Sequence, residues 1–144
     1  MNFEDLVKLN DPNILGVVGS RKWPSKSFVY REIQKYLDRF PTITIIVSGG
    51  QPKGVDGCAA SFAKENGITL IEHLPAHWYD KDDERYKPFA YTNYFDRNTK
   101  IADDSDVLLA FCLEGSRGTM DTYKKAKARD VRAFMFTEKD VDHE

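Results

Sequence analysis

The chain has 144 residues, of which 41% are hydrophobic and 31% are charged. This length and balance are typical of one soluble globular domain whose core needs no disulfide or metal ion. The formal charge is −2 and there is no long basic run, which argues against a protein whose main task is to grip a nucleic-acid backbone. No stretch approaches the roughly 20 apolar residues of a membrane-spanning helix, so we expect no membrane partner.

The N-terminus and the two cysteines both indicate the cytoplasm. Residues 1–11 carry acidic side chains early and contain no apolar stretch like that of a signal peptide. Cys58 and Cys112 fall in a predicted helix and a predicted strand, which favours buried free thiols in a reducing compartment over a disulfide. We therefore expect a cytoplasmic protein.

Short apolar runs alternate with helical spacing along the first half of the chain. Ser25 suits a helix N-cap, Pro41 ends the helix that follows, and Asn66-Gly67 stands at the usual place of a left-handed C-cap. In chain order the spacing predicts a strand at 14–18, a helix at 25–40, a strand at 43–47, a helix at 55–66 and a strand at 68–74.

The second half continues this alternation after a long irregular segment at 75–88. The segment holds the charge cluster 80–85, and it is equally consistent with a lid or binding segment and with a solvated loop. Beyond it the sequence predicts a helix at 89–102, a strand at 107–111, a helix at 119–129 and a strand at 131–136. The polar end at 137–144 is expected to be frayed.

Strict alternation of apolar strands and helices predicts an α/β fold, in which helices cover both faces of a parallel sheet. With right-handed crossovers, the favoured arrangement is a single Rossmann-like three-layer domain with a five-stranded parallel sheet in the order 3-2-1-4-5. We divide the chain into an N-terminal segment at 1–13, this domain at 14–136 and the tail at 137–144. In that strand order, ligands bind at the carboxyl ends of strands 1 and 4, where the chain reverses direction.

Three turns with glycine follow strands 1, 2 and 4 at that edge: Gly19-Ser20-Arg21, the segment 48–56 and the segment 115–119. The last two also open helices, so their backbone N–H groups converge at the positive end of a helix dipole, as in phosphate sites. The alternative is that these residues bind no ligand: the glycines then serve only the flexibility of the turns, and Ser116 or Thr119 is only a helix cap. The residues that we predict around a phosphate-bearing ligand are Gly19, Ser20, Arg21, Gly49, Gly50, Lys53, Gly54, Asp56, Arg97, Asn98, Gly115, Ser116, Gly118 and Thr119.

Charged side chains near these turns extend the site. Arg21 and Arg97 are the candidate cations, because a planar guanidinium can donate two parallel hydrogen bonds to a phosphate. Asp56 lies in the first turn of its helix, where it either accepts hydrogen bonds from a ribose or complements the helix dipole. His73 and His77 lie on a strand and its exit with no cysteine nearby, so we predict no metal site.

Other ligand classes have little support. The chain lacks both Gly-x-x-x-x-Gly-Lys-Ser/Thr and a Gly-x-Gly-x-x-Gly after the first strand, which disfavours a Walker-type ATPase and an NAD-dependent dehydrogenase. No cofactor is predicted. For Trp78, core packing is favoured over stacking on a base.

The motifs stand in the order seen in the SLOG superfamily, a group of Rossmann-like domains named after the DNA-processing protein DprA/Smf and the plant LOG enzymes. The chain resembles most the small stand-alone bacterial and phage branch described as YspA-like, from about residue 15 to residue 133. The matching segments are Val18-Gly19-Ser20-Arg21, Ser48-Gly49-Gly50 with Lys53-Gly54-Val55-Asp56, Pro75-Ala76-His77-Trp78, Arg97-Asn98 and Gly115-Ser116-Arg117-Gly118-Thr119.

This resemblance implies binding of a nucleotide or nucleotide-derived ligand, such as an ADP-ribose-like signal or a nucleoside phosphate, and a homo-oligomer. In LOG enzymes it also implies hydrolysis of the bond between base and ribose 5′-monophosphate, with a glutamate in a Pro-Gly-Gly-x-Gly-Thr-x-x-Glu turn. Aligned on Gly118-Thr119, that glutamate falls at Thr122, so the catalytic carboxylate is missing from its place. Asp121, which points about 100° away on the helix, and Glu114 are the remaining candidates nearby.

Three functions are therefore weighed. Binding of a nucleotide-type small molecule is favoured. A LOG-like phosphoribohydrolase would need Asp121, Glu114 or Asp56 to stabilise positive charge on the ribose. DprA-like binding of single-stranded DNA is disfavoured by the near-neutral charge.

Overall fold

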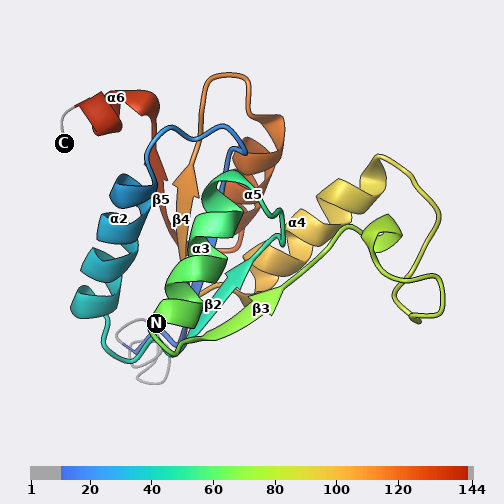
Figure 1. Cartoon of the computed structure of the whole chain (residues 1–144), viewed down its shortest axis with the longest axis horizontal. Coiled ribbons are helices and arrows are strands. Elements are labelled where there is room, and N and C mark those ends of the chain that lie inside the picture. The colour runs from blue at the N-terminus through green and yellow to red at the C-terminus, as the bar shows by residue number, and fades with distance from the viewer. Residues whose placement is uncertain (1–10, 143–144) are drawn as a thin grey trace.

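Five apolar runs form a parallel sheet in the middle of the molecule (Figure 1). The computed structural model describes residues 11–142; most of the predicted N-terminal segment and the last two residues of the predicted tail lie outside the described residues. The sheet has the order β3-β2-β1-β4-β5, which confirms the predicted α/β fold and strand order. The strands are β1 (Ile14–Gly19), β2 (Ile45–Ser48), β3 (Thr69–Glu72), β4 (Val107–Phe111) and β5 (Arg132–Phe136).

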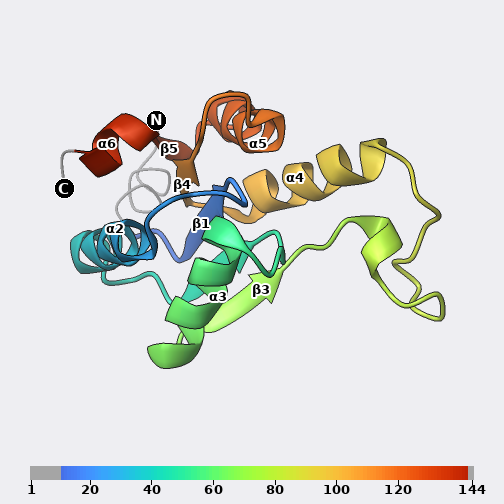
Figure 2. The same ribbon diagram turned by 45° about the horizontal axis from the view of Figure 1, so that its top comes forward.

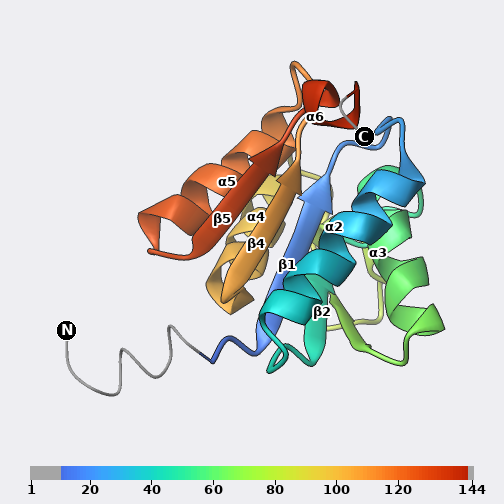
Figure 3. The same ribbon diagram turned by 90° about the vertical axis from the view of Figure 1, so that its left-hand side faces the viewer.

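Helices cover both faces of this sheet, as Figure 3 shows. Alternate side chains of β1 explain the two layers, because Leu15 and Val17 face one side while Val18 faces the other. Helices α2 and α3 pack on the first face, and α4 and α5 pack on the second. The helices are α2 (Lys26–Arg39), α3 (Gly54–Glu65), α4 (Thr92–Asp104), α5 (Arg117–Ala128) and α6 (Glu138–Asp142), with a 3-10 turn η1 (Ala76–Trp78).

The predicted helix caps on this framework are confirmed. The Ser25 hydroxyl oxygen accepts a hydrogen bond from the Phe28 N–H at 3.1 Å, at the start of α2. At the end of α3, Gly67 has a φ of +63°, which is the left-handed conformation that favours glycine.

Several element ends differ from the sequence prediction by two or three residues. Strand β2 begins at Ile45 rather than at residue 43, because the Ile43 N–H turns back to the carbonyl oxygen of Phe40 at 3.0 Å. Helix α4 begins at Thr92 rather than at residue 89, and α5 begins at Arg117 rather than at residue 119. Part of the tail that was expected to be frayed, Glu138–Asp142, forms the short helix α6.

The segment between β3 and α4 reaches away from the sheet, as Figures 1 and 2 show. Apart from η1 it is irregular, as predicted for residues 75–88. A hydrogen bond from the Lys87 N–H to the carbonyl oxygen of Ala76, at 3.3 Å, joins its two ends. The segment thus returns the chain to α4 beside the carboxyl end of the sheet.

Both cysteines are free thiols, as predicted. Among the described residues, no helix has the length and apolar character needed to cross a membrane.

Candidate functional site

A cleft of about 320 Å³ opens where β1, β2 and β4 end. Ten of the predicted site residues line it: Gly19, Ser20, Arg21, Gly49, Asp56, Arg97, Asn98, Ser116, Gly118 and Thr119. Four others, Gly50, Lys53, Gly54 and Gly115, are not among its lining residues. The cleft also contains six residues that were not predicted at the site: Val18, Gln51, Trp78, Tyr94, Ile101 and Thr122.

The first turn of α5 forms an open wall of this cleft. Among the described residues, no group accepts a hydrogen bond from the backbone N–H groups of Arg117, Gly118 or Thr119. Gly118 is exposed, and a Cβ placed on it would meet nothing within 4 Å. Ser116 does not cap the helix with its side chain; its hydroxyl donates instead to the hydroxyl of Thr119 at 2.9 Å. The unpaired N–H groups of Arg117, Gly118 and Thr119 thus lie at the positive end of the helix dipole, and Gly118 and Thr119 line the cleft.

In the first turn of α3, one N–H group is paired with the loop after β1. The Val55 N–H donates to the carbonyl oxygen of Ser20 at 3.4 Å. Gly54 has a φ of +69°, and a Cβ on it would lie 2.4 Å from that same oxygen. Gly54 is therefore needed so that the loop after β1 can pass over the first turn of α3, which agrees with its absence from the cleft lining.

The loop after β1 is held between the other two turns. The Ser20 N–H donates to the carbonyl oxygen of Phe111 at 3.0 Å, and the Ser20 hydroxyl accepts from the Leu113 N–H at 3.1 Å. Ser20 thus joins β1 to the loop that leads into α5. The next residue, Arg21, is exposed at the cleft, and within residues 11–142 its side chain has no hydrogen bond or ion pair. Its guanidinium is free to bind an anion.

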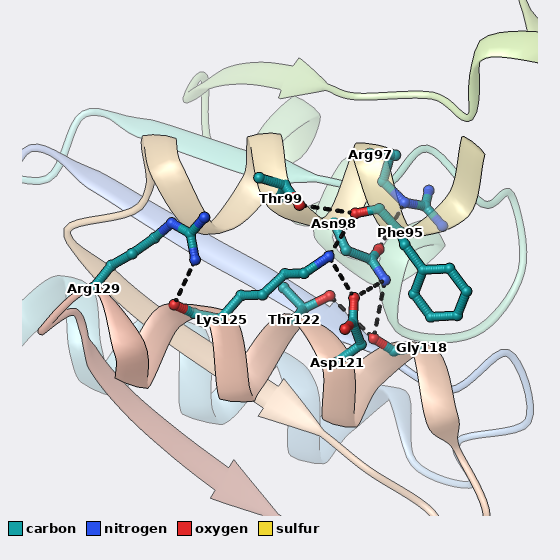
Figure 4. A network of polar contacts seen from close by, with 9 residues as sticks. All are labelled: Phe95, Arg97, Asn98, Thr99, Gly118, Asp121, Thr122, Lys125 and Arg129. Atoms are coloured by element: carbon teal, nitrogen blue, oxygen red, sulfur yellow. Dashed lines mark hydrogen bonds and ion pairs between the residues drawn. The ribbon is translucent and has the colours of Figure 1, made fainter. Parts of the chain in front are cut away.

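Arg97 and Asn98 form a polar floor that connects the walls. Arg97 Nε donates to Asn98 Oδ1 at 2.9 Å, and an Arg97 terminal nitrogen donates to the carbonyl oxygen of Gly49 at 2.6 Å. The Asn98 amide donates to the carbonyl oxygen of Gly118 and to Asp121 Oδ2, both at 3.2 Å (Figure 4). Burial lowers the pKa of Arg97, and Asp56 nearby opposes this shift. The floor therefore links the end of β2 to the first turn of α5.

Asp56 is the one carboxylate among the described residues that line the cleft. Its side chain is buried, and it accepts hydrogen bonds from the Ser48 hydroxyl at 3.1 Å and from the Gln51 N–H at 3.2 Å. Burial raises its pKa to about 6, although Arg97 and these two donors lower it. A Cβ on Gly49 would lie 2.7 Å from Arg97 and 2.8 Å from Asp56. Only glycine therefore leaves room for both charged side chains to lie against the backbone at this position.

Aromatic side chains line another part of the cleft. Trp78 is 37% exposed, so the favoured interpretation that it packs in the core is wrong. Its ring lies edge-on to Tyr94, with a centroid distance of 6.3 Å and an interplanar angle of 87°. This pairing could not be predicted from local spacing, because an irregular segment separates the two residues in the sequence. Exposed rings at a cleft can stack on a planar ligand group.

The two carboxylates proposed in place of the LOG glutamate lie outside the cleft. Asp121 accepts from Asn98 and forms an ion pair of 2.9 Å with Lys125, as Figure 4 shows. Glu114 and Asp121 line a separate hollow beside Met120 and Met135. Thr122 does line the cleft, but it is buried and its hydroxyl donates to the carbonyl oxygen of Gly118 at 3.1 Å.

The histidines have other partners. His73 Nε2 lies 2.5 Å from Asp104 Oδ2, and His77 Nδ1 lies 3.1 Å from the Asn93 amide. Within the part of the chain that the structure describes, no group of three metal-ligating side chains is present.

Comparison with known proteins supports the predicted family resemblance. The family model described as "YspA, cpYpsA-related SLOG family" matches residues 14–78, a little under half of the chain. These residues include the turns after β1 and β2. No curated protein sequence matches the chain.

Solved structures share its fold. DNA processing protein A from Streptococcus pneumoniae is 22% identical with a TM-score of 0.66, over 90% of this chain and 52% of that chain. The corresponding protein from Helicobacter pylori is 20% identical with a TM-score of 0.63, over 88% of this chain and 66% of that one. The molybdenum cofactor carrier protein from Chlamydomonas reinhardtii is 23% identical with a TM-score of 0.62, over 91% of this chain and 81% of that chain. The chain thus spans about half the length of the pneumococcal protein.

The family match, the strand order and the likeness of these folds agree with the order of motifs in the sequence. The predicted resemblance to the SLOG superfamily is thus confirmed over residues 14–78, where the matching family model is that of the YspA and cpYpsA-related branch.

Proposed function

We propose that this protein binds a nucleotide or a nucleotide-derived small molecule in the cleft, with a phosphate at the first turn of α5. The observation that carries this proposal is the pair of unpaired N–H groups at Gly118 and Thr119, with the free guanidinium of Arg21 lining the same cleft. Converging N–H groups at the positive end of a helix dipole suit a phosphate. A guanidinium adds charge-assisted hydrogen bonds.

The rest of the cleft suits the other parts of a nucleotide. Trp78 and Tyr94 offer ring surface for a base, and Asp56 offers acceptors for a sugar. A volume of about 320 Å³ is at the small end of ligand sites, so we favour a mononucleotide unit over a longer ligand inside the cleft.

The comparisons support a small ligand at this fold without naming it. One structural neighbour is a molybdenum cofactor carrier protein. Another is described for its single-stranded DNA binding mode. Because Arg21 is the one exposed cation among the described lining residues, a nucleotide is the better fit here than a long nucleic-acid backbone. We also propose that the protein works in the cytoplasm, as the N-terminus and the cysteines indicate, and as a homo-oligomer, as the family resemblance implies.

Hydrolysis of an N-glycosidic bond is a second candidate, because one buried carboxylate, Asp56, does face the cleft. A carboxylate near the ribose could stabilise the positive charge that develops on the sugar. Binding alone remains the favoured function, since Thr122 stands in the place of the LOG glutamate.

Native mass spectrometry of the freshly purified protein tests the proposal by asking whether a nucleotide is bound. Calorimetric titration with the four ribonucleoside 5′-monophosphates, ADP-ribose and a short single-stranded oligonucleotide then compares the candidate ligand classes. Arg21→Ala should weaken nucleotide binding by roughly tenfold to a hundredfold, because a charge-assisted contact contributes about 1.5–3 kcal/mol.

Lys22→Ala is the matched control. Lys22 is the neighbouring exposed cation and does not line the cleft, so its loss should leave affinity nearly unchanged. Equal losses of nucleotide affinity in both variants would show that net charge, rather than a contact of Arg21, determines binding. Binding of the oligonucleotide alone would contradict the proposal.

A further inference from the structure

Asp56 has more hydrogen-bond acceptors than its own chain satisfies. A carboxylate offers about four lone-pair sites, and the structure fills two of them, with the Ser48 hydroxyl and the Gln51 N–H. Arg97 lies nearby, but it donates to Gly49, His73 and Asn98 instead. Two acceptor sites of this buried, cleft-lining carboxylate therefore have no donor among the described residues.

Such an arrangement is unfavourable unless something supplies the missing donors. A buried charged group that lacks partners is costly, and the raised pKa of Asp56 agrees with incomplete compensation by its neighbours. Gly49 keeps the approach open, since any side chain there would collide with both Asp56 and Arg97. The site is thus kept accessible to a ligand that brings its own donors.

Asn98, another polar side chain of the cleft, has no donor left for a ligand. Both hydrogens of its amide are taken by the Gly118 carbonyl oxygen and by Asp121. Its Oδ1 already accepts from Arg97. Of these two side chains, Asp56 alone has hydrogen-bonding capacity left for a ligand.

We propose that Asp56 accepts hydrogen bonds from the 2′- and 3′-hydroxyl groups of the ligand, so that the cleft selects ribonucleotides over deoxyribonucleotides. Two vicinal hydroxyl groups supply two donors at the separation of two carboxylate oxygens, as an acidic side chain does for the ribose in dinucleotide-binding folds. A deoxy sugar leaves an acceptor unpaired, and buried polar groups that lose their partner discriminate strongly. This specificity rests on the proposed function, with phosphate at α5 and sugar toward Asp56.

The first test needs no variant. Isothermal titration of the unmodified protein compares AMP, GMP, CMP and UMP with their 2′-deoxy counterparts, and the tightest of them also with its 3′-deoxy form. We expect each missing hydroxyl to weaken binding by roughly tenfold to a hundredfold, the effect of a hydrogen bond to a charged group.

Asp56→Asn then tests the residue. The amide keeps the size of the side chain but loses acceptor capacity, so the ratio of ribo- to deoxyribonucleotide affinity should fall toward one. Glu72→Gln is the matched control, because Glu72 is an exposed carboxylate that acts on Asp56 through its charge and does not line the cleft. The ratio of ribo- to deoxyribonucleotide affinity in Glu72→Gln should match that of the unmodified protein.

The outcomes separate this inference from the proposed function. Equal affinity for ribo- and deoxyribonucleotides in the unmodified protein would overturn the role of Asp56 while nucleotide binding stood. A ratio unchanged by Asp56→Asn, or a change in base preference instead, would also overturn it. Failure of every nucleotide to bind would remove both proposals together.

Discussion

The side-chain amide of Asn98 donates a hydrogen bond of 3.2 Å to the carbonyl oxygen of Gly118, and this contact joins α4 to the first turn of α5. The same amide reaches Asp121, and Asp121 in turn pairs with Lys125. Figure 4 shows Asn98 crossing from one helix to the other. The turn that we propose for phosphate therefore depends on a residue of another helix for its position.

Asn98→Ala should lower both stability and affinity. It removes buried hydrogen bonds to Gly118, Asp121 and Arg97, so we expect a loss of about 1–3 kcal/mol in the free energy of unfolding and weaker nucleotide binding. Denaturant titration and calorimetry measure the two effects. Thr99→Ala is the control in the same helix, since Thr99 donates only to its own helix at Phe95. If Asn98→Ala and Thr99→Ala behaved alike, the link between the helices would not position the site.

Two glycine variants should separate binding from folding. A Cβ on Gly118 meets nothing within 4 Å, and alanine favours a helix by about 1 kcal/mol. Gly118→Ala should therefore keep or raise the melting temperature while it crowds the phosphate and weakens binding. Gly54→Ala should instead destabilise the fold, because its Cβ would lie 2.4 Å from the carbonyl oxygen of Ser20. Thermal melts and calorimetry test both, and tight binding by Gly118→Ala would argue against a phosphate at this turn.

The protein should release no appreciable free base from nucleoside 5′-monophosphates. Thr122 is a buried hydroxyl bonded to Gly118, and a neutral group stabilises a positively charged sugar poorly compared with a carboxylate. Chromatography after overnight incubation with AMP, GMP, CMP and UMP measures this. Were base released, Asp56→Asn and Asp121→Asn would identify the carboxylate responsible, and loss of activity in Asp121→Asn would contradict the geometry described above.

Asp56 should make stability depend on pH. Its pKa rises on folding from 3.8 to about 6, so the unfolded chain loses this proton first as pH rises. Stability contributed by the protonated form is therefore lost between about pH 4 and pH 6. Asp56→Asn removes this titration, and its stability relative to the unmodified protein should increase by up to about 3 kcal/mol from pH 4 to pH 7. Denaturant titrations at both values test this, and a constant difference would show that Asp56 does not titrate as described.

Much of the fold could be predicted from the sequence, because short local residue patterns determine where most strands and helices lie. Apolar runs such as 107–111 are continuous since both faces of a parallel strand are buried, and Ser25 and Gly67 mark helix ends by their own chemistry. The start of α4 was less accurate, because aromatic residues 89–91 have helical spacing but precede the first helical turn.

The candidate site was predictable where it follows strand ends and less so where contacts are long-range. Arg21 and Gly118 lie in the turns that follow β1 and β4 at one sheet edge, so both were expected near the ligand. That Gly54 serves contact with Ser20 rather than the cleft depends on residues more than 30 positions apart in the sequence. Trp78 and Tyr94 meet through the fold of the irregular segment, which no local pattern specifies.

A crystal structure of the protein with the ribonucleoside 5′-monophosphate that binds most tightly in the titrations tests the central claim most directly. We predict phosphate oxygens within hydrogen-bond distance of the Gly118 and Thr119 N–H groups and of the Arg21 guanidinium, with the sugar toward Asp56. A nucleotide bound in the hollow beside Met120 and Met135, or a phosphate at the first turn of α3, would contradict the proposed phosphate site at α5.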